Sequence, residues 1–236
     1  MTANNSRLST DALSPGQLPE SVKALLKRAK INRFPKKNTI VHAGAESHSL
    51  YLILKGSVSI IVEESDHREI IVAYLNAGDF FGEMGLFEIN PHRTAEVRTR
   101  EVCEIAEIEY DTFHELCQQY PDLSYALFAQ LARRLKHTTR KVTDLAFIDV
   151  QGRIARCLID LAAQPESMML PNGRQIRITR QEIGRLVGCS REMVGRVLKT
   201  LEEQGMIEME GKAILIYDSA LHTTESIDTD DHDDDE

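Results

Sequence analysis

The stretch ITRQEIGRLVGCSREMVGRVLKTLEEQG, residues 178–205, predicts two short helices joined by the tetrapeptide VGCS. Thr179 and Glu182 have the spacing of a capping box, in which each side chain bonds the other residue's backbone N–H, so the first helix begins there. Ser190 is a residue type that caps helix N-termini, and we expect it to begin the second helix. Apolar residues recur at helical spacing in both segments.

Two glycines favour a helix-turn-helix over a plain helical hairpin. Gly188 follows the first helix and supplies the left-handed backbone conformation that other residues resist. Gly184 is small at a place where two helices that cross near a right angle come close. A generic helical hairpin needs neither glycine, nor a polar N-terminal end on its second helix. The stretch therefore predicts a helix-turn-helix that binds DNA.

The second helix of this motif offers polar side chains that suit base recognition in a major groove. Arg191 and Arg196 can each grip guanine O6 and N7 with two hydrogen bonds, and Glu192 can accept one from cytosine N4. Arg180, on the first helix, is better placed to touch phosphate. Residues 174–199 hold seven bases and two acids, a local charge of +5, and phosphate attraction needs such a local surplus. For any single arginine, a solvated helix face remains the alternative.

The segments on either side extend this domain. MIEMEGKAILIYD, residues 206–218, reads as two short strands around a turn, which is a hairpin. RIARCLIDLAAQ, residues 153–164, reads as an amphipathic helix, and residues 165–173 read as a loop with two prolines and a glycine. The composition changes near residues 148–151, where we place the boundary to a preceding domain.

Residues 39–109 predict several short strands separated by turn residues. LYLILKGSVSIIV is an apolar, β-branched run interrupted by one glycine, and HREIIVAYL follows it after a polar turn. Many short strands at this spacing argue for a small antiparallel roll or barrel rather than a parallel sheet.

A long helix follows the strands, from Pro121 to about Phe147. Apolar or small side chains recur along it in steps of four and three residues. This pattern is an a/d seam, which favours dimerisation of one helix against another. The alternative is a helix that lies on the core of its own domain. The seam consists of Leu127, Leu131, Leu135, Thr138, Val142 and Leu145.

The stretch FGEMGLFEINPHRTAEV, residues 81–97, places an acid and a base near each other in the strand-rich part. Glu83 lies between two glycines, and Arg93 follows ten positions later. They form either a surface ion pair or two walls of a pocket for a ligand with both a hydroxyl and an anionic group.

Composition and cysteine spacing exclude several classes of protein. The chain is 42% hydrophobic and 28% charged, and no apolar run approaches the roughly 20 residues of a membrane span. The first twenty residues lack the features of a secretory signal, so we expect a cytoplasmic protein. The four cysteines form no C-x-x-C pair, and no paired histidines or catalytic triad pattern stands out. We expect neither a metal site nor an enzyme.

The net charge of −9 belongs to the end of the chain. From residue 219 onward the sequence holds eight acids and no Lys or Arg; without them the balance is 28 minus 29, or −1. Such a run is typical of a disordered, solvating tail. Two alternatives are a weak metal site and an electrostatic mimic of nucleic acid that folds back on a basic surface.

Residues 20–218 resemble the cyclic AMP receptor proteins of the CRP/FNR family of bacterial transcription regulators. Four motifs carry this resemblance, and they occur in the family's order: GDFFGEMGLFE with RTAEV, ARRLKHTTRKV, LAFIDVQGRIA, and ITRQEIGRLVGCSREMVGRVLK. The resemblance implies a β-roll that binds a cyclic nucleotide. Iron–sulfur sensors of the same family need N-terminal cysteines, and this chain has none before Cys103.

The resemblance also implies a role for particular residues. Glu83 would accept a hydrogen bond from the ribose 2′-hydroxyl, and Arg93 would pair with the cyclic phosphate. The Thr94 hydroxyl and the backbone N–H groups around Gly82 to Met84 would assist with the phosphate. Thr138 and Thr139 would meet the adenine from the two subunits. The implied DNA-binding residues are Arg180, Ser190, Arg191, Glu192 and Arg196.

Together these observations predict an α+β protein with five parts. These are a flexible N-terminus (1–20), a cyclic nucleotide-binding β-roll (21–120), a dimerisation helix (121–148), a winged helix-turn-helix (149–218) and a disordered acidic tail (219–236). The expected function is cyclic AMP-responsive transcription regulation by a homodimer that binds palindromic DNA. The resemblance implies half-sites similar to TGTGA and a contact with RNA polymerase through residues 164–173. The alternatives are a family regulator that acts without ligand or with another one such as cyclic GMP, and a nucleotide-binding interaction module without a DNA role.

Overall fold

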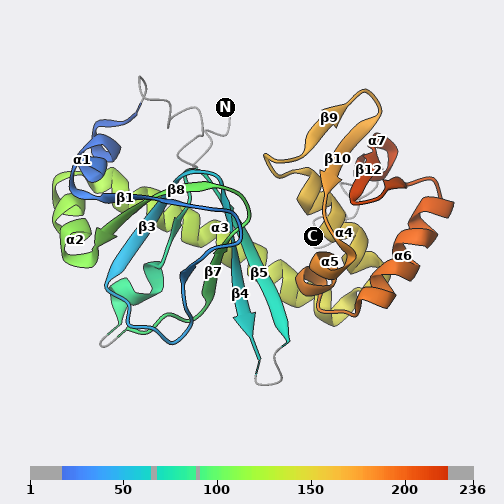
Figure 1. The fold of residues 1–236 in the computed structure, drawn as a ribbon, viewed down its shortest axis with the longest axis horizontal. Helices are drawn as coiled ribbons and strands as arrows, with labels where there is room; N and C mark the ends of the chain where they lie inside the picture. The colour runs from blue at the N-terminus through green and yellow to red at the C-terminus, as the bar shows by residue number, and fades with distance from the viewer. Residues whose placement is uncertain (1–17, 65–67, 89–90, 223–236) are drawn as a thin grey trace, which may run out of the picture. The chain divides into compact units, whose positions relative to one another are not determined.

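The computed structural model describes residues 18–64, 68–88 and 91–222 (Figure 1). Contacts divide the chain into two compact units, one up to Arg140 and one from Lys141. The division falls within the long helix and not at residues 148–151, where the composition changes. Residues 1–17 of the expected flexible N-terminus and residues 223–236 of the expected acidic tail lie outside the described residues.

The first unit contains two antiparallel four-stranded sheets, as expected for a β-roll. One sheet has the strand order β1-β8-β3-β6 and the other β2-β7-β4-β5. The strands are β1 (Lys30–Phe34), β2 (Thr39–Val41), β3 (Ser49–Lys55), β4 (Ser57–Glu63), β5 (Glu69–Asn76), β6 (Phe80–Phe81), β7 (Glu96–Thr99) and β8 (Cys103–Glu109). The sequence reading began at residue 39 and missed β1.

Two apolar clusters fix this arrangement. Ile105 on β8 and Val97 on β7 belong to one cluster, which joins the inner faces of the two sheets. Ala106, the next residue on β8, belongs to the other cluster, which joins the opposite face of the same sheet to the helices. Successive side chains of a strand point to opposite faces, so a strand covered on both sides is apolar at successive positions.

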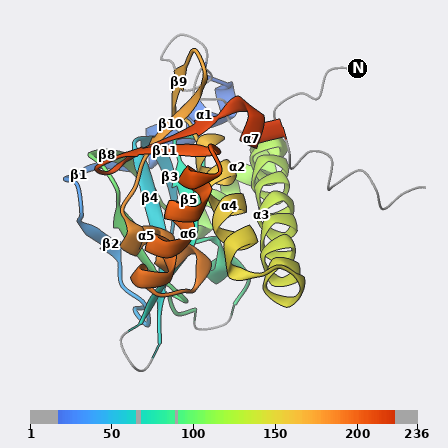
Figure 2. The same ribbon diagram turned by 90° about the vertical axis from the view of Figure 1, so that its right-hand side faces the viewer.

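Among the described residues, two helices, one helical turn and the part of a third helix up to Arg140 complete the first unit. They are α1 (Glu20–Arg28), the 3₁₀ turn η2 (Glu83–Phe87), α2 (Tyr110–Gln119) and α3 (Pro121–Phe147). Helix α3 is one continuous helix with the bounds expected from the sequence (Figure 2). None of the helices in the described part of the chain is long and apolar enough to cross a membrane.

The second unit contains a helix-turn-helix and a four-stranded antiparallel sheet with the order β11-β12-β10-β9. The expected hairpin is β11 with β12. Part of the expected loop at 165–173 is instead a second hairpin, because residues 168–170 pair with residues 173–175. The elements are α4 (Val150–Ala162), β9 (Met168–Leu170), β10 (Gly173–Arg177), α5 (Arg180–Val187), α6 (Arg191–Glu203), β11 (Ile207–Glu210), β12 (Ala213–Tyr217) and α7 (Asp218–His222). The first four residues of the expected acidic tail are therefore helical.

Candidate functional site

Arg93 is a buried cation surrounded by neutral oxygens. It is 8% exposed, and its Nη2 donates to the carbonyl of Ser49 at 2.8 Å. Its Nη1 lies 3.3 Å from the carbonyl of Gly82 and 3.4 Å from the hydroxyl of Tyr110. Within the described residues, no carboxylate oxygen lies within 4.0 Å of this guanidinium. Burying a charge is costly unless it is paired, so the site favours an anion.

The ring beside Arg93 does not supply that negative charge. The Cζ atom of Arg93 lies 5.3 Å from the centroid of the Tyr51 ring, which stacks on Phe81 at 4.8 Å. Burial, assisted by the nearby carboxylate of Glu107, raises the pKa of Tyr51 to about 12. The phenol therefore stays protonated at neutral pH.

Glu83 does not pair with Arg93, although both side chains are buried. Its Oε1 accepts from Nη1 of Arg134 at 2.9 Å, and Arg134 also donates to the carbonyl of Phe80. The other oxygen of Glu83, Oε2, has no hydrogen-bond partner in the described part of the chain. The acid and base of residues 81–97 are therefore two separate groups, each with capacity left for something else.

Gly82 and the hydroxyl of Tyr110 hold this segment together. Gly82 has φ +80° and ψ +14°, a left-handed conformation that favours glycine. A Cβ atom there would lie 2.5 Å from Nη1 of Arg93, so a larger residue would also displace the Arg93 guanidinium. The Tyr110 hydroxyl donates to the Gly82 carbonyl at 2.6 Å and lies 2.6 Å from Oγ of Ser47. It thus contacts Arg93 and the backbone segment before η2 at once.

Helix α3 holds the same segment from another side. Gln130 is 4% exposed, and its side-chain amide forms two hydrogen bonds with the backbone of Phe80. Its Nε2 donates to the Phe80 carbonyl at 2.7 Å, and its Oε1 accepts from the Phe80 N–H at 2.8 Å. Arg134 lies one helical turn further on. Sequence reasoning missed Gln130, Arg134 and Tyr110; only the ARRLKHTTRKV motif contains one of them, and nothing local marks its role.

The other expected ligand residues lie near these elements or further along α3. Met84 is on η2 and Thr94 precedes β7, and both are exposed. Thr138 and Thr139 are exposed on α3, one helical turn beyond Arg134. The described residues contain no group of three or more His, Cys, Asp or Glu side chains that could hold a metal ion.

The exposed apolar stripe of α3 differs by one residue from the expected seam. Leu127 is 2% exposed and packs in the core of its own roll, and Leu131 is partly buried against the same cluster. Phe128, the next residue after Leu127, is more than half exposed. The stripe then runs in steps of three and four residues through Phe128, Leu131, Leu135, Thr138, Val142 and Leu145. Of these, Leu135, Val142 and Leu145 are also more than half exposed.

The helix-turn-helix forms as the sequence predicts, but the structure gives a different reason for the glycine at position 184. Thr179 and Glu182 form a complete capping box, and Ser190 accepts from the Met193 N–H at 3.2 Å. Gly188 has φ +74°, in the left-handed region. A Cβ atom at Gly184 would lie 2.6 Å from the backbone oxygen of Cys189. Gly184 is therefore required by the turn between the helices rather than by the crossing of the helices themselves.

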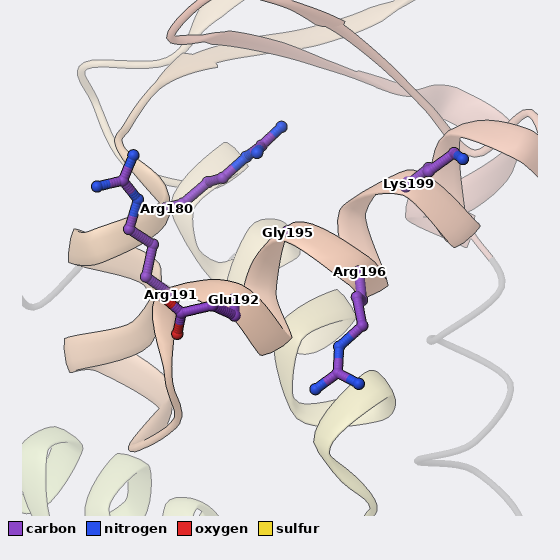
Figure 3. A pocket seen from close by; sticks show the side chains of 6 residues that line it. All are labelled: Arg180, Arg191, Glu192, Gly195, Arg196 and Lys199. Atoms are coloured by element: carbon purple, nitrogen blue, oxygen red, sulfur yellow. The ribbon is translucent and has the colours of Figure 1, made fainter.

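An open depression between α5 and α6 gathers the expected DNA-binding side chains. Figure 3 shows its lining, with Arg180 from α5 and the other residues from α6: Arg180, Arg191, Glu192, Gly195, Arg196 and Lys199. The three arginines are exposed and form no ion pair with any described residue. Lys199 lies 3.6 Å from Glu203, and both side chains are mostly exposed. Ser190 lies at the N-terminus of α6, where its hydroxyl is used as the cap.

Glu192 is held in its ionised form. Its own backbone N–H and the Ser190 hydroxyl, followed by Arg191 and Arg196, lower the pKa of its carboxyl below the ordinary value. At neutral pH it is an acceptor only, which suits an amino group such as cytosine N4.

Comparisons with known proteins match both units. A model of the cyclic nucleotide-binding domain matches residues 31–120, and a model of bacterial regulatory proteins of the crp family matches residues 176–207. The cAMP-activated global transcriptional regulator Vfr of Pseudomonas aeruginosa is 55% identical over 196 residues, which are 82% of this chain and 92% of Vfr. The chain belongs to the crp family of bacterial regulatory proteins.

Two further members of the family are similar over most of their length. The cAMP-activated global transcriptional regulator CRP of Escherichia coli is 49% identical over 205 residues, covering 87% of this chain and 98% of CRP. The solved structure of the c-di-GMP responsive global regulator CLP of Xanthomonas campestris is 44% identical, with a TM-score of 0.78. That match covers 84% of this chain and 98% of CLP. The mixed α and β fold, with a nucleotide-binding roll, a long helix and a DNA-binding unit, is therefore the family's fold.

Proposed function

We propose that the chain is a homodimeric transcription regulator that responds to cyclic AMP and binds palindromic DNA. The observation that carries the ligand part is Arg93, a buried guanidinium whose hydrogen-bond acceptors are all neutral. The relatives named as cAMP-activated support the same ligand, and they are regulators rather than enzymes. A regulator of this kind acts in the cytoplasm.

The pocket's chemistry suits a 3′,5′-cyclic nucleotide. Arg93 would bind the singly charged cyclic phosphate, assisted by the Thr94 hydroxyl and the N–H groups of Gly82 to Met84. Glu83 would accept from the ribose 2′-hydroxyl through Oε2, while Arg134 keeps its Oε1 in place. Charge-assisted hydrogen bonds of this kind are about twice as strong as neutral ones. Thr138 and Thr139 would then lie toward the base.

The number of available cations favours a ligand with one phosphate over one with two. CLP is described as c-di-GMP responsive, and that ligand carries two phosphates. In this chain the positive charge of Arg134 is already matched by Glu83, while Arg93 has no such partner among the described residues. One unmatched buried cation pairs with one anionic phosphate, so we assign cyclic AMP rather than a cyclic dinucleotide.

The exposed seam on α3 supports the dimer. A stripe of apolar side chains at steps of three and four residues is the pattern that packs against a second copy of itself. We assign the interface to Phe128, Leu131, Leu135, Thr138, Val142 and Leu145. A two-fold dimer places two copies of α6 about one DNA turn apart, roughly 34 Å, and so reads a palindrome.

The cations of α5 and α6 favour a DNA role over a nucleotide-binding module that acts only on proteins. Arg191 and Arg196 would bind guanine, Glu192 would bind cytosine, and Arg180 and Ser190 would lie near phosphate. This set fits half-sites similar to TGTGA. Ligand binding would shift the population of dimers toward the spacing of the two α6 helices that fits the operator.

Residues 164–173 support a contact with RNA polymerase. They contain β9, which is an edge strand of its sheet, and Met168 and Met169 are mostly exposed there. Exposed apolar side chains on an unpaired edge are suited to contact with another protein.

Calorimetry with cyclic AMP, cyclic GMP and c-di-GMP tests the ligand assignment. We expect one cyclic AMP to bind per chain and c-di-GMP to bind more weakly; equal binding of c-di-GMP would overturn the argument from charge. For the DNA part, Arg191→Ala should cost about 1–3 kcal/mol on a TGTGA-type operator and relax the preference at one base pair. As a control, Lys199→Ala should weaken binding to all sequences alike. Unchanged base preference in Arg191→Ala would refute the recognition-helix assignment.

A further inference from the structure

Four cations and one acid, Glu192, line the DNA-facing surface of the second unit. Arg180, Arg191 and Arg196 are exposed and have no carboxylate within 4.0 Å in the part of the chain that the structure describes. Residues 174–199 hold seven bases and two acids. Arginines on one surface repel one another, and acids in addition to Glu192 would relieve more of that repulsion.

The same chain carries the complementary charge at its end. Residues 223–236, TTESIDTDDHDDDE, hold eight acids and no Lys or Arg. They follow α7, which packs on β12 and belongs to the same compact unit as α5 and α6. The 222 residues before them hold 28 bases and 29 acids, so most of the net charge of −9 comes from these fourteen residues.

The length of this segment is sufficient for it to reach the cations. Fourteen residues span at most about 50 Å when extended. Residues 141–222 form a unit of 82 residues, and a compact unit of that size has a radius of gyration of about 12 Å and a diameter of about 30 Å. A segment that starts at His222 therefore reaches every face of its own unit.

We propose that residues 223–236 bind the cationic surface formed by Arg180, Arg191, Arg196 and Lys199, and that they compete there with DNA. The proposal rests on the DNA-binding role assigned above to this surface. Because the segment is tethered, its effective concentration at the surface is on the order of millimolar, so even a weak contact is populated. DNA has a higher charge density and displaces the segment when it binds.

A second cationic surface gives the proposal a clear alternative. Five side chains in and around β1 form no ion pair with any residue described: Lys27, Lys30, Arg33, Lys36 and Lys37. They belong to the first unit, whereas the acidic segment leaves from the second. The surface of α5 and α6 is favoured because reaching it requires no particular arrangement of the two units.

Two variants and one cross-linking measurement test the proposal. One variant ends at His222, and the other replaces the eight acids by their amides at unchanged length. We measure their affinity for operator and non-operator duplexes by fluorescence anisotropy. At about 50 mM salt both should bind about 2- to 10-fold more tightly than the full chain. The factor should be the same for both duplexes, because both need the same surface, and it should shrink at about 200 mM salt.

Carbodiimide cross-linking of the full chain distinguishes direct contact between the segment and the cationic surface from long-range repulsion between the segment and DNA. The reagent joins a carboxylate to an amine only where the two groups touch. Mass spectrometry should find the segment joined to Lys199, and operator DNA should abolish that cross-link. Lys199→Arg keeps the charge but removes the amine, so it should lose the product. Cross-links only to Lys27, Lys30 or Lys36, or affinities unaltered in both variants, would overturn the proposal. If the chain that ends at His222 binds no DNA, the assigned DNA role fails, while the cross-link still reports on the segment.

Discussion

Replacing Arg93 by glutamine separates a ligand-binding role from a structural one. The substitution removes a buried cation, whose desolvation costs several kcal/mol. It also removes the donor to the Ser49 carbonyl at 2.8 Å, and an unsatisfied buried acceptor costs about 1–3 kcal/mol. Because these changes oppose each other, the unfolding free energy of the ligand-free variant should lie within about 2 kcal/mol of wild type. That corresponds to less than about 8 °C in Tm for a chain of this size.

Ligand binding should respond much more strongly than stability. A hydrogen bond to a charged group contributes about 1.5–3 kcal/mol, so the affinity of Arg93→Gln for cyclic AMP should fall about 10- to 150-fold. Calorimetry measures this directly. In thermal unfolding, cyclic AMP at a hundred times the wild-type Kd should stabilise the wild-type protein by about 2.7 kcal/mol. The same concentration should stabilise the variant by only about 0.3–1.4 kcal/mol.

Arg134→Gln is the matched control, because the same change of residue type breaks a buried ion pair. Glu83, whose side chain is 10% exposed, would lose its partner. Removing one partner of a buried pair costs about 3–5 kcal/mol, so this variant should unfold at a clearly lower temperature without ligand. If Arg93→Gln lost as much stability as Arg134→Gln and still bound cyclic AMP with wild-type affinity, Arg93 would be a structural residue. The assignment of the phosphate site would then be wrong.

Three further predictions concern the seam, the turn and a thiol of raised pKa. Leu135→Asp should dissociate the dimer in sedimentation velocity, whereas the control Lys136→Asp, at the exposed neighbouring position on α3, should not. If the Leu135→Asp variant stayed dimeric, the seam would not be the dimer interface. Gly184→Ala should lower the free energy of unfolding by about 1–3 kcal/mol, because the new Cβ atom would lie 2.6 Å from the backbone oxygen of Cys189. In the control Gly195→Ala the nearest atom to the new Cβ is Nη1 of Arg180 at 3.4 Å, so this variant should be as stable as wild type or more stable. Equal effects of the two substitutions would contradict the turn geometry. Cys157 is partly exposed, but desolvation raises the pKa of its thiol to about 12, so roughly 10⁻⁴ of it is thiolate at about pH 8. Iodoacetamide should therefore label the native protein much more slowly than the unfolded one, and equal labelling rates would contradict the raised pKa.

Local signals in the sequence were enough to predict the helix-turn-helix. Its capping box, its left-handed glycine and its second cap each depend on residues no more than four positions apart. The structure contains all three. Gly184 was recognised for the wrong reason, because a sequence shows that space is needed but not which atom needs it. The close atom is a backbone oxygen of the turn.

The surroundings of Arg93 and Glu83 were harder to predict from the sequence, because part of their framework comes from a distant helix. Arg134 and Gln130 lie about fifty positions after the residues they bind, and nothing in a helix marks which of its polar side chains will meet a strand. For a similar reason, the sequence does not show whether Leu127 or Phe128 lies on the exposed stripe of α3. Both are apolar and adjacent, and only the docking of α3 on its own roll decides which one is buried.

The same docking connects the proposed ligand to the proposed dimer seam. Residues 80–83 are held on one side by Arg93 and Tyr110, which contact the Gly82 carbonyl, and on the other by Gln130 and Arg134. If a phosphate draws Arg93 toward itself and the segment follows through the hydrogen bond to the Gly82 carbonyl, the segment either shifts with α3 or breaks the two hydrogen bonds of Gln130. Each such bond contributes about 1 kcal/mol, and allosteric coupling between sites is typically 1–3 kcal/mol. Because Leu131 and Leu135 lie on the same two turns of α3, moving that helix is the route by which one bound ligand would alter the seam.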